Sequence, residues 1–347
     1  MRKLINSLLG KKAAEPTEDF AYSKQIETAP IEIVVEGMPP FPIADHMYGH
    51  NKFPILNWDE VHKWVERAPS DELKAIAWHA CEHGWLVHFK QALGQSYSLI
   101  ESEGAVLLSS LGTKRSRATI DYMNRTLNRV AKVLGGIARV PQWGKDILIV
   151  FQDADSYYDY VSQYYPERGG EFAFSGGMHI NSGCSHYVTV DAEMHSIEPV
   201  IAHEMAHGCL SHLPLPLWLN EGLAVNTERR LAGSGVSLYT PAEMRQKHLC
   251  FWGENEIQEF WSGKSFHRTD DGNFLSYDLA RILIELMAKD WERFKQFVLN
   301  ADMIDGGACS ALEHLGVDLG KAVCSLLEKP MDDAWTPAPK RWSQDQN

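Results

Sequence analysis

The sequence PVIAHEMAHGCLSHLPLPLWLNEGLA at residues 199–224 holds the two patterns that decide the fold. Its first part places His203 and His207 four residues apart, so on a helix they lie one turn above each other on the same face. Two imidazoles in this arrangement can share one zinc ion. Glu204, beside them, can then remove a proton from the water that attacks a substrate. The first pattern therefore indicates a catalytic metal site.

Glu221, in the second pattern, supplies the expected third ligand. Pro214 and Pro216 disfavour helix across the connecting loop, so a new helix is predicted to begin near Trp218. Glu221 then lies in the first turns of that helix, where its carboxylate can turn back toward the histidines. Two histidines and one glutamate with an open fourth position are a donor set of catalytic zinc sites. The alternative is a solvated carboxylate that the helix dipole favours in a first turn.

HEMAH followed by LPLWLNEGLA resembles the gluzincins, the metallopeptidase group that contains thermolysin and the aminopeptidase N-like enzymes. The pattern is most similar to compact peptidase-MA-like members of that group. The resemblance spans about Ser96 to Leu299. It implies an α+β, zincin-like (thermolysin-like) catalytic domain with one catalytic Zn²⁺ and a peptide or protein substrate. A non-catalytic or latent gluzincin-like module that binds metal or another protein is the alternative function.

The resemblance also implies a role for Tyr277. In aminopeptidase N-like enzymes, a tyrosine beyond the glutamate helix stabilises the oxyanion of the tetrahedral intermediate. Tyr277 opens an apolar helix at the matching place, and a phenol can donate a hydrogen bond to developing negative charge. His267 is the rival donor, and a half-buried structural tyrosine is the plain alternative.

The resemblance also implies an edge strand that binds the substrate. Aminopeptidases of this group use a Gly-x-Met-Glu-Asn motif whose glutamate grips the free amine of the substrate. Gly177, Met178 and His179 are the matching substrate-binding residues here, and His179 stands where the glutamate would be. An imidazole cannot neutralise an ammonium group, so the chain departs from aminopeptidase specificity. The strand can still pair with an extended peptide, and a plain glycine turn into an edge strand is the alternative.

A second histidine motif, His79-Ala80-Cys81-Glu82-His83, spells the inverted zinc signature H-x-x-E-H. No downstream glutamate lies in a matching second-helix context, and the motif falls outside the resembling region. Charged and polar positions on an amphipathic helix are the preferred interpretation, with a metal site as the alternative.

Outside these motifs the pattern predicts α+β organisation. Ser196 should cap the motif helix, with Pro199 in its first turn, and the chain beyond it should be almost wholly helical. The other expected elements are helices within 58–92, a hairpin of strands 97–100 and 105–108, a helix over 116–134, a buried strand over 146–151, a helix over 154–164, and strands over 177–180 and 186–190.

Four regions are expected along the chain. They are a flexible segment (1–30), a helical N-terminal region of unknown role (31–95), a catalytic domain (96–328, with the sheet and motif helix in 96–230 and a helical part in 231–328) and a frayed tail (329–347).

The composition and the N-terminal sequence indicate which binding partners and which cellular location to expect. The 347 residues carry a net charge of −13, which argues against nucleic acid as a partner. No apolar run is long enough to span a membrane, although residues 1–12 could form a short basic amphipathic surface anchor. The N-terminus lacks a signal-peptide pattern, and the six scattered cysteines are typical of buried thiols in a reducing compartment. We therefore expect a cytoplasmic location; the sequence leaves the oligomeric state open.

Overall fold

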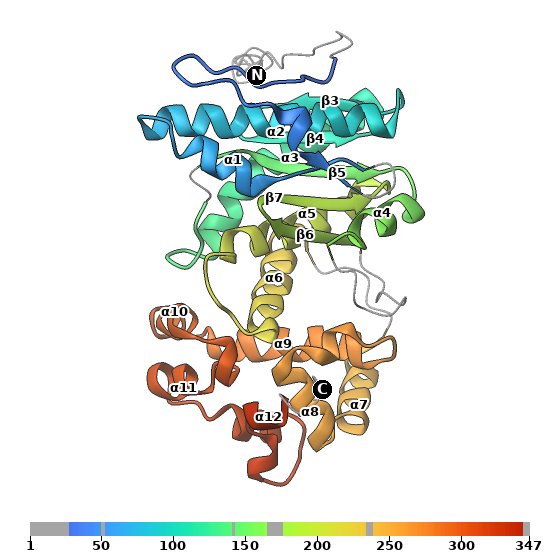
Figure 1. Cartoon of the computed structure of the whole chain (residues 1–347). Coiled ribbons are helices and arrows are strands. Elements are labelled where there is room, and N and C mark those ends of the chain that lie inside the picture. Colours follow the sequence, from blue (N-terminus) through green and yellow to red (C-terminus); the bar gives the residue numbers. More distant parts are fainter. Residues whose placement is uncertain (1–27, 50–52, 141–142, 165–175, 234–238, 343–347) are drawn as a thin grey trace, which may run out of the picture.

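A mixed five-stranded sheet organises the upper half of the molecule, and helices make up the lower half (Figure 1). The computed structural model describes residues 28–49, 53–140, 143–164, 176–233 and 239–342. The predicted α+β class is confirmed. The expected surface anchor at residues 1–12 lies outside the described residues. None of the described helices has the length and apolar character needed to cross a membrane.

The strand order in the sheet is β3-β4-β5-β7-β6. The antiparallel hairpin of β3 (Ser98–Glu101) and β4 (Ala105–Ser109) confirms the predicted one. Strand β5 (Asp146–Phe151) runs parallel to both β4 and β7 (Cys184–Val190). Strand β6 (Gly177–Ser182) pairs antiparallel with β7 and is the outer strand on that side of the described sheet.

Both faces of the sheet are buried, which explains why β5 is almost continuously apolar. Its side chains alternate between the two faces: Leu148 and Val150 join one core cluster, and Ile147, Ile149 and Phe151 join the other. The first cluster contains residues of α3 (Thr113–Val133) and α5 (Met194–Leu210), and the second contains residues of α2 (Asp71–Leu93). Helix α4 (Ala154–Val161) also packs into the second cluster.

The N-terminal region, for which the sequence indicates no role, covers that second face of the sheet (Figure 1). It consists of the 3₁₀ helix η1 (Ile43–His46), the two-stranded ribbon of β1 (Met47–Tyr48) and β2 (Ile55–Leu56), α1 (Trp58–Val65) and α2. Asn57 caps α1 and Ser70 caps α2, each by accepting a hydrogen bond from a backbone N–H three residues on. The region thus shares one hydrophobic core with the sheet.

The predicted start of α5 at a Ser196 cap is wrong. The helix begins at Met194 after Glu193, and the Ser196 N–H already donates to the Glu193 carbonyl at 2.9 Å. Pro199 consequently lies inside the helix. It removes only one intrahelical hydrogen bond, to the carbonyl of His195, and His195 is exposed near the helix start.

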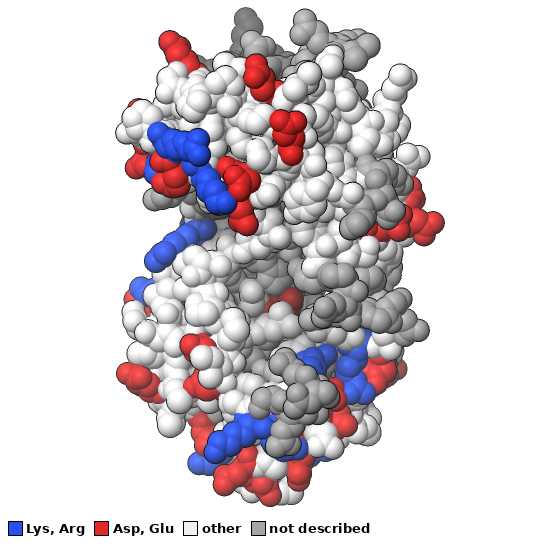
Figure 2. Space-filling model, viewed as in Figure 1, with Lys and Arg blue, Asp and Glu red and all other residues white. Residues whose placement is uncertain are grey.

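Helices form the lower half of the molecule, as expected. In chain order they are α6 (Leu217–Ala232), α7 (Pro241–Phe251), α8 (Glu254–Ser262), η2 (Lys264–His267), α9 (Gly272–Met287), α10 (Trp291–Asn300), η3 (Met303–Asp305), α11 (Ala308–Ser310), the π-helical η4 (Ala311–Leu315), α12 (Leu319–Leu326), η5 (Asp333–Trp335) and α13 (Pro339–Trp342). Figure 2 shows the surface hollowed between the two halves, with an acidic side chain inside the hollow.

The C-terminal tail is not frayed as far as residue 342. Trp335 is buried, and its carbonyl accepts a hydrogen bond from the Trp261 indole at 2.9 Å. The Gln258 side chain also accepts a hydrogen bond from the Trp342 indole at 3.0 Å. These aromatic anchors outweigh the polar, proline-rich composition that suggested fraying. All six cysteines are free thiols, but Cys250 and Cys309 are exposed rather than buried.

Candidate metal centre

Helices α5 and α6 bring the three predicted ligands together. His203 and His207 lie on one face of α5, with ring centroids 4.8 Å apart. The Glu221 Oε2 atom on α6 lies 3.2 Å from His203 Nε2 and 3.5 Å from His207 Nε2. Among the described residues, these three form the only group of His, Cys, Asp or Glu side chains whose donor atoms converge within 4.8 Å. The predicted clustering is confirmed.

The second nitrogen of each histidine ring also has a partner. His203 Nδ1 lies 3.1 Å from Glu228 Oε2, and His207 Nδ1 lies 3.0 Å from Asn220 Oδ1. Histidines that bind metal usually donate their other ring N–H to such an oxygen, which fixes the tautomer and the ring orientation. These contacts leave both Nε2 atoms directed at Glu221. Neither Glu228 nor Asn220 was anticipated, although Glu228 is seven residues beyond Glu221 and therefore on the same face of α6.

The site favours a positive charge. Only 12% of the Glu221 side chain and 15% of the His203 side chain are exposed. Burial acts to raise the pKa of Glu221, but the two imidazoles outweigh it and hold this pKa well below its usual range. Burial acts to lower the pKa of His203, but Glu221 and Glu228 outweigh it and hold this pKa well above its usual range. Two imidazoles and one carboxylate in such a place are a donor set that fits a divalent cation.

Glu204 interacts electrostatically with His203, His207 and Glu221, and it is 7% exposed. Burial raises its pKa, although His203, His207 and the backbone N–H of His179 oppose this effect. A raised pKa makes a carboxylate a stronger base and so favours the acceptance of a proton. Gly177 on β6 allows the strand to approach, because a Cβ atom there would lie 2.3 Å from the side chain of Val200. The edge strand therefore passes close to the motif helix.

His179 on β6 is held as a neutral imidazole. Burial, reinforced by His207 and His186, lowers its pKa to about 3. Its Nε2 atom lies 2.8 Å from Ser185 Oγ, and its ring lies 5.3 Å from the ring of Tyr187. A neutral ring in this position has no charge with which to hold a substrate amine. Met178 lies beside it on the same strand and is partly buried.

Tyr277 on α9 lies beside the cluster, with its ring 6.5 Å from that of His203 and 5.1 Å from that of Phe266. Burial, with Glu221 and Glu204, raises its pKa well above the usual range, so the phenol keeps its proton and can donate it in a hydrogen bond. His267, the rival donor, is an exposed residue of η2. The geometry thus places the ring of Tyr277 beside His203.

Close packing of α6 on α9 sets this position of Tyr277. A Cβ atom on Gly222 would lie 2.9 Å from the Ala280 carbonyl oxygen and 2.7 Å from Ile284 Cγ1. Only glycine allows the two helices to approach so closely. The residue after the third ligand is thereby in direct contact with the helix that carries the phenol.

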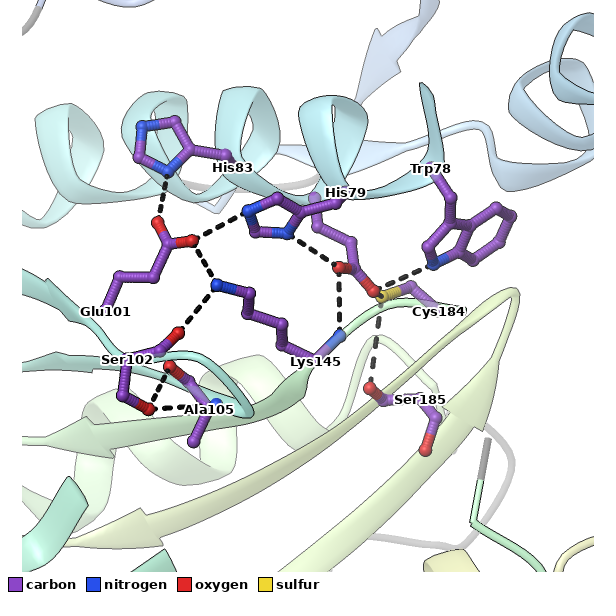
Figure 3. Close-up of polar contacts among 10 residues, drawn as sticks. Trp78, His79, His83, Glu101, Ser102, Ala105, Lys145, Cys184 and Ser185 are labelled. Carbon is purple, nitrogen blue, oxygen red and sulfur yellow. Dashed lines mark hydrogen bonds and ion pairs between the residues drawn. The ribbon is translucent and has the colours of Figure 1, made fainter. Parts of the chain in front are cut away.

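The second histidine motif forms an ion-pair cluster at the junction of α2 and the sheet (Figure 3). Glu101 on β3 lies 2.7 Å from His79 Nε2, 3.2 Å from His83 Nδ1 and 2.5 Å from Lys145 Nζ. Lys145 and His79, whose pKa is raised to about 9, are the cations that pair with Glu101, and the rings of His79 and His83 are 6.4 Å apart. This motif is not among the converging donor groups of the described residues.

Glu82 of the same motif is buried, contrary to the expectation of a polar helix face. Its carboxylate accepts hydrogen bonds from Trp78 Nε1 at 2.8 Å and from the Lys145 backbone N–H at 3.2 Å. A buried carboxylate needs such donors to offset the loss of water. Glu82 therefore ties α2 to the start of β5.

Comparisons with known proteins add no family to this description. No protein-family model matches the chain, and no curated protein matches it. The functional argument therefore rests on the residues and their geometry.

Proposed function

We propose that the protein is a zinc-dependent metallopeptidase of the gluzincin type, with a zincin-like catalytic domain. The convergence of His203, His207 and Glu221 beside Glu204 is the observation that carries this proposal. Three nitrogen and oxygen donors on two adjacent helices match the ligand number of a catalytic zinc site and leave a position for water and substrate. Zinc is the metal we assign, because mixed imidazole and carboxylate donors suit it.

The ligand set and the base have separate roles. A bound zinc ion supplies Lewis acidity, which makes water a better nucleophile and polarises the scissile carbonyl. Glu204 accepts the proton of the attacking water and later gives it to the leaving amine. Its raised pKa makes it a stronger base for the first of these proton transfers.

Tyr277 and β6 act on the substrate. The protonated phenol of Tyr277 donates a hydrogen bond to the oxygen on which negative charge develops. We place an extended peptide alongside β6, one of the two outer strands of the described sheet, because a sheet edge binds peptides by adding a strand. The neutral His179 offers no anion for a free amine, so we assign cleavage away from the amino end.

Profiling of a diverse peptide library by mass spectrometry tests this function. Zinc-loaded wild type should cleave, and Glu204→Gln should retain zinc but lose about 10²-fold to 10⁴-fold in turnover, because an amide cannot accept the proton. Glu198→Gln, on the same helix but outside the cluster, is the matched control and should cleave normally. Cleavage by Glu204→Gln at the wild-type rate would disprove the mechanism. No cleavage by any zinc-loaded form would favour the non-catalytic module.

A further inference from the structure

His248 on α7 is a buried histidine with two defined partners, and no step described above uses it. It is 5% exposed. Its Nδ1 atom accepts a hydrogen bond from the Trp252 indole N–H at 2.9 Å. Its Nε2 atom therefore carries the donor proton that faces Asp278 Oδ2 at 3.0 Å. The ring is thus fixed in one orientation, with a single donor aimed at α9.

Asp278 is the residue directly after Tyr277 and is held from two sides. Besides the contact with His248, its Oδ1 atom accepts hydrogen bonds from Arg281 Nε at 2.9 Å and Arg281 Nη2 at 2.7 Å. Burial acts to raise the pKa of Asp278, but these partners outweigh it and lower this pKa. Arg281 lies on α9 itself and orients the carboxylate, so among these contacts the one with His248 ties α9 to another helix, α7.

A second set of contacts fixes the opposite side of the same helix. The side-chain amide of Asn226 on α6 donates to the Arg281 carbonyl at 3.1 Å and to the Gly222 carbonyl at 2.8 Å. The bond to Gly222 lies within α6, so the bond to the Arg281 carbonyl, together with the close approach at Gly222, holds α9 against α6. The contact between Asp278 and His248 then limits rotation of α9 about its own axis. Successive residues on a helix are about 100° apart, so that rotation sets where Tyr277 points.

We propose that His248 is a positioning residue for Tyr277. Acting through Asp278, it holds α9 at the rotation that places the phenol beside His203 and Glu221. This inference deepens the proposed function and rests on it for its catalytic consequence. Its structural part, the placement of the phenol, can be measured without any activity.

A double-mutant cycle tests the catalytic part. His248→Leu removes the donor and should lower kcat about tenfold with KM and zinc content unchanged, because a small misplacement of a catalytic group lowers the rate. In a Tyr277→Phe background the same substitution should cause no further loss. His248→Gln, whose amide can still donate to Asp278, should restore most of kcat.

Gln258→Leu is the matched control, because Gln258 is equally buried but bonds the tail at Ala334 and Thr336 rather than α9. Its effect on kcat, if any, should be the same with and without the phenol. Equal losses from His248→Leu in the wild-type and Tyr277→Phe backgrounds would overturn the proposal, as would a change in KM alone.

The structural part is tested with 3-fluorotyrosine placed at position 277 and observed by ¹⁹F NMR. His248→Leu should shift or broaden the signal, His248→Gln should leave it close to that of the wild type, and Gln258→Leu should not change it. An unchanged signal in folded His248→Leu would overturn the proposal whether or not the protein cleaves peptides. An inactive wild type that still shows the expected shifts would disprove only the proposed peptidase activity.

Discussion

The cluster around Glu101 makes the stability of the protein depend on pH through His79. Hydrogen bonds that His79 donates to Glu101 and then to Glu82 raise its pKa from 6.5 to about 9, against the opposing effect of burial. This histidine therefore binds its proton more tightly in the folded protein than in the unfolded chain. Its contribution to stability is fully present below pH 6.5 and is lost as the pH rises through about 9.

The size of this contribution follows from the shift. Each pKa unit corresponds to about 1.4 kcal/mol, so the shift of His79 gives an upper bound of about 3 kcal/mol. Solvent screening reduces this figure to about 2 kcal/mol, because 29% of the His79 side chain and 29% of the Glu101 side chain are exposed. The contribution belongs to the interactions of His79 with Glu101 and Glu82 and is counted once, on the histidine.

Urea unfolding of the wild type and His79→Gln between pH 6 and pH 9.5 measures this effect. The difference in free energy of unfolding should shrink by about 2 kcal/mol as the pH rises across that range. In a Glu101→Gln background the difference should depend much less on pH, because the main partner is absent. A difference that stays constant across the range in the wild-type background would refute the reasoning.

Two further predictions concern the metal centre and its support. Glu228→Gln should weaken zinc binding about 10-fold to 100-fold, because the amide is a weaker hydrogen-bond partner for His203 than the carboxylate that orients it. Competition with a chelator measures the zinc affinity, and an unchanged affinity would argue against the orienting role of Glu228. Gly222→Ala should lower the free energy of unfolding by about 1–3 kcal/mol, because its methyl group would push α6 from α9. Gly112→Ala, where a methyl group meets nothing within 4 Å, is the control, and equal urea midpoints for the two variants would contradict the packing argument.

Local patterns explain why much of the site was predictable. On a helix, the four-residue spacing of His203 and His207 places both side chains on the same face. Pro214 and Pro216 restrict where the next helix can begin. Together with the gluzincin resemblance, these two features predicted that Glu221 lies near the histidines. The hairpin of β3 and β4 was also predictable from local sequence, because both strands and the turn between them lie within a dozen residues.

The parts that the sequence did not reveal depend on packing between distant segments. Helix α2 is buried on more than one side, and the buried Glu82 looks in the sequence like a solvated charge. The pairing of Glu228 with His203 and the contact of His248 with Asp278 each join two different helices. Trp335 anchors a tail whose composition predicts fraying. The local pattern of apolar and polar residues does not indicate contacts between such distant segments.

The zinc content of purified protein, measured by native mass spectrometry, tests the central claim most directly. Wild type should bind one zinc ion per chain, and His207→Ala should bind none under the same conditions because it lacks one of the three ligands. His212→Ala, which changes a nearby histidine outside the cluster, should keep its zinc. Full zinc occupancy in His207→Ala would contradict the assignment of His203, His207 and Glu221 as the metal ligands.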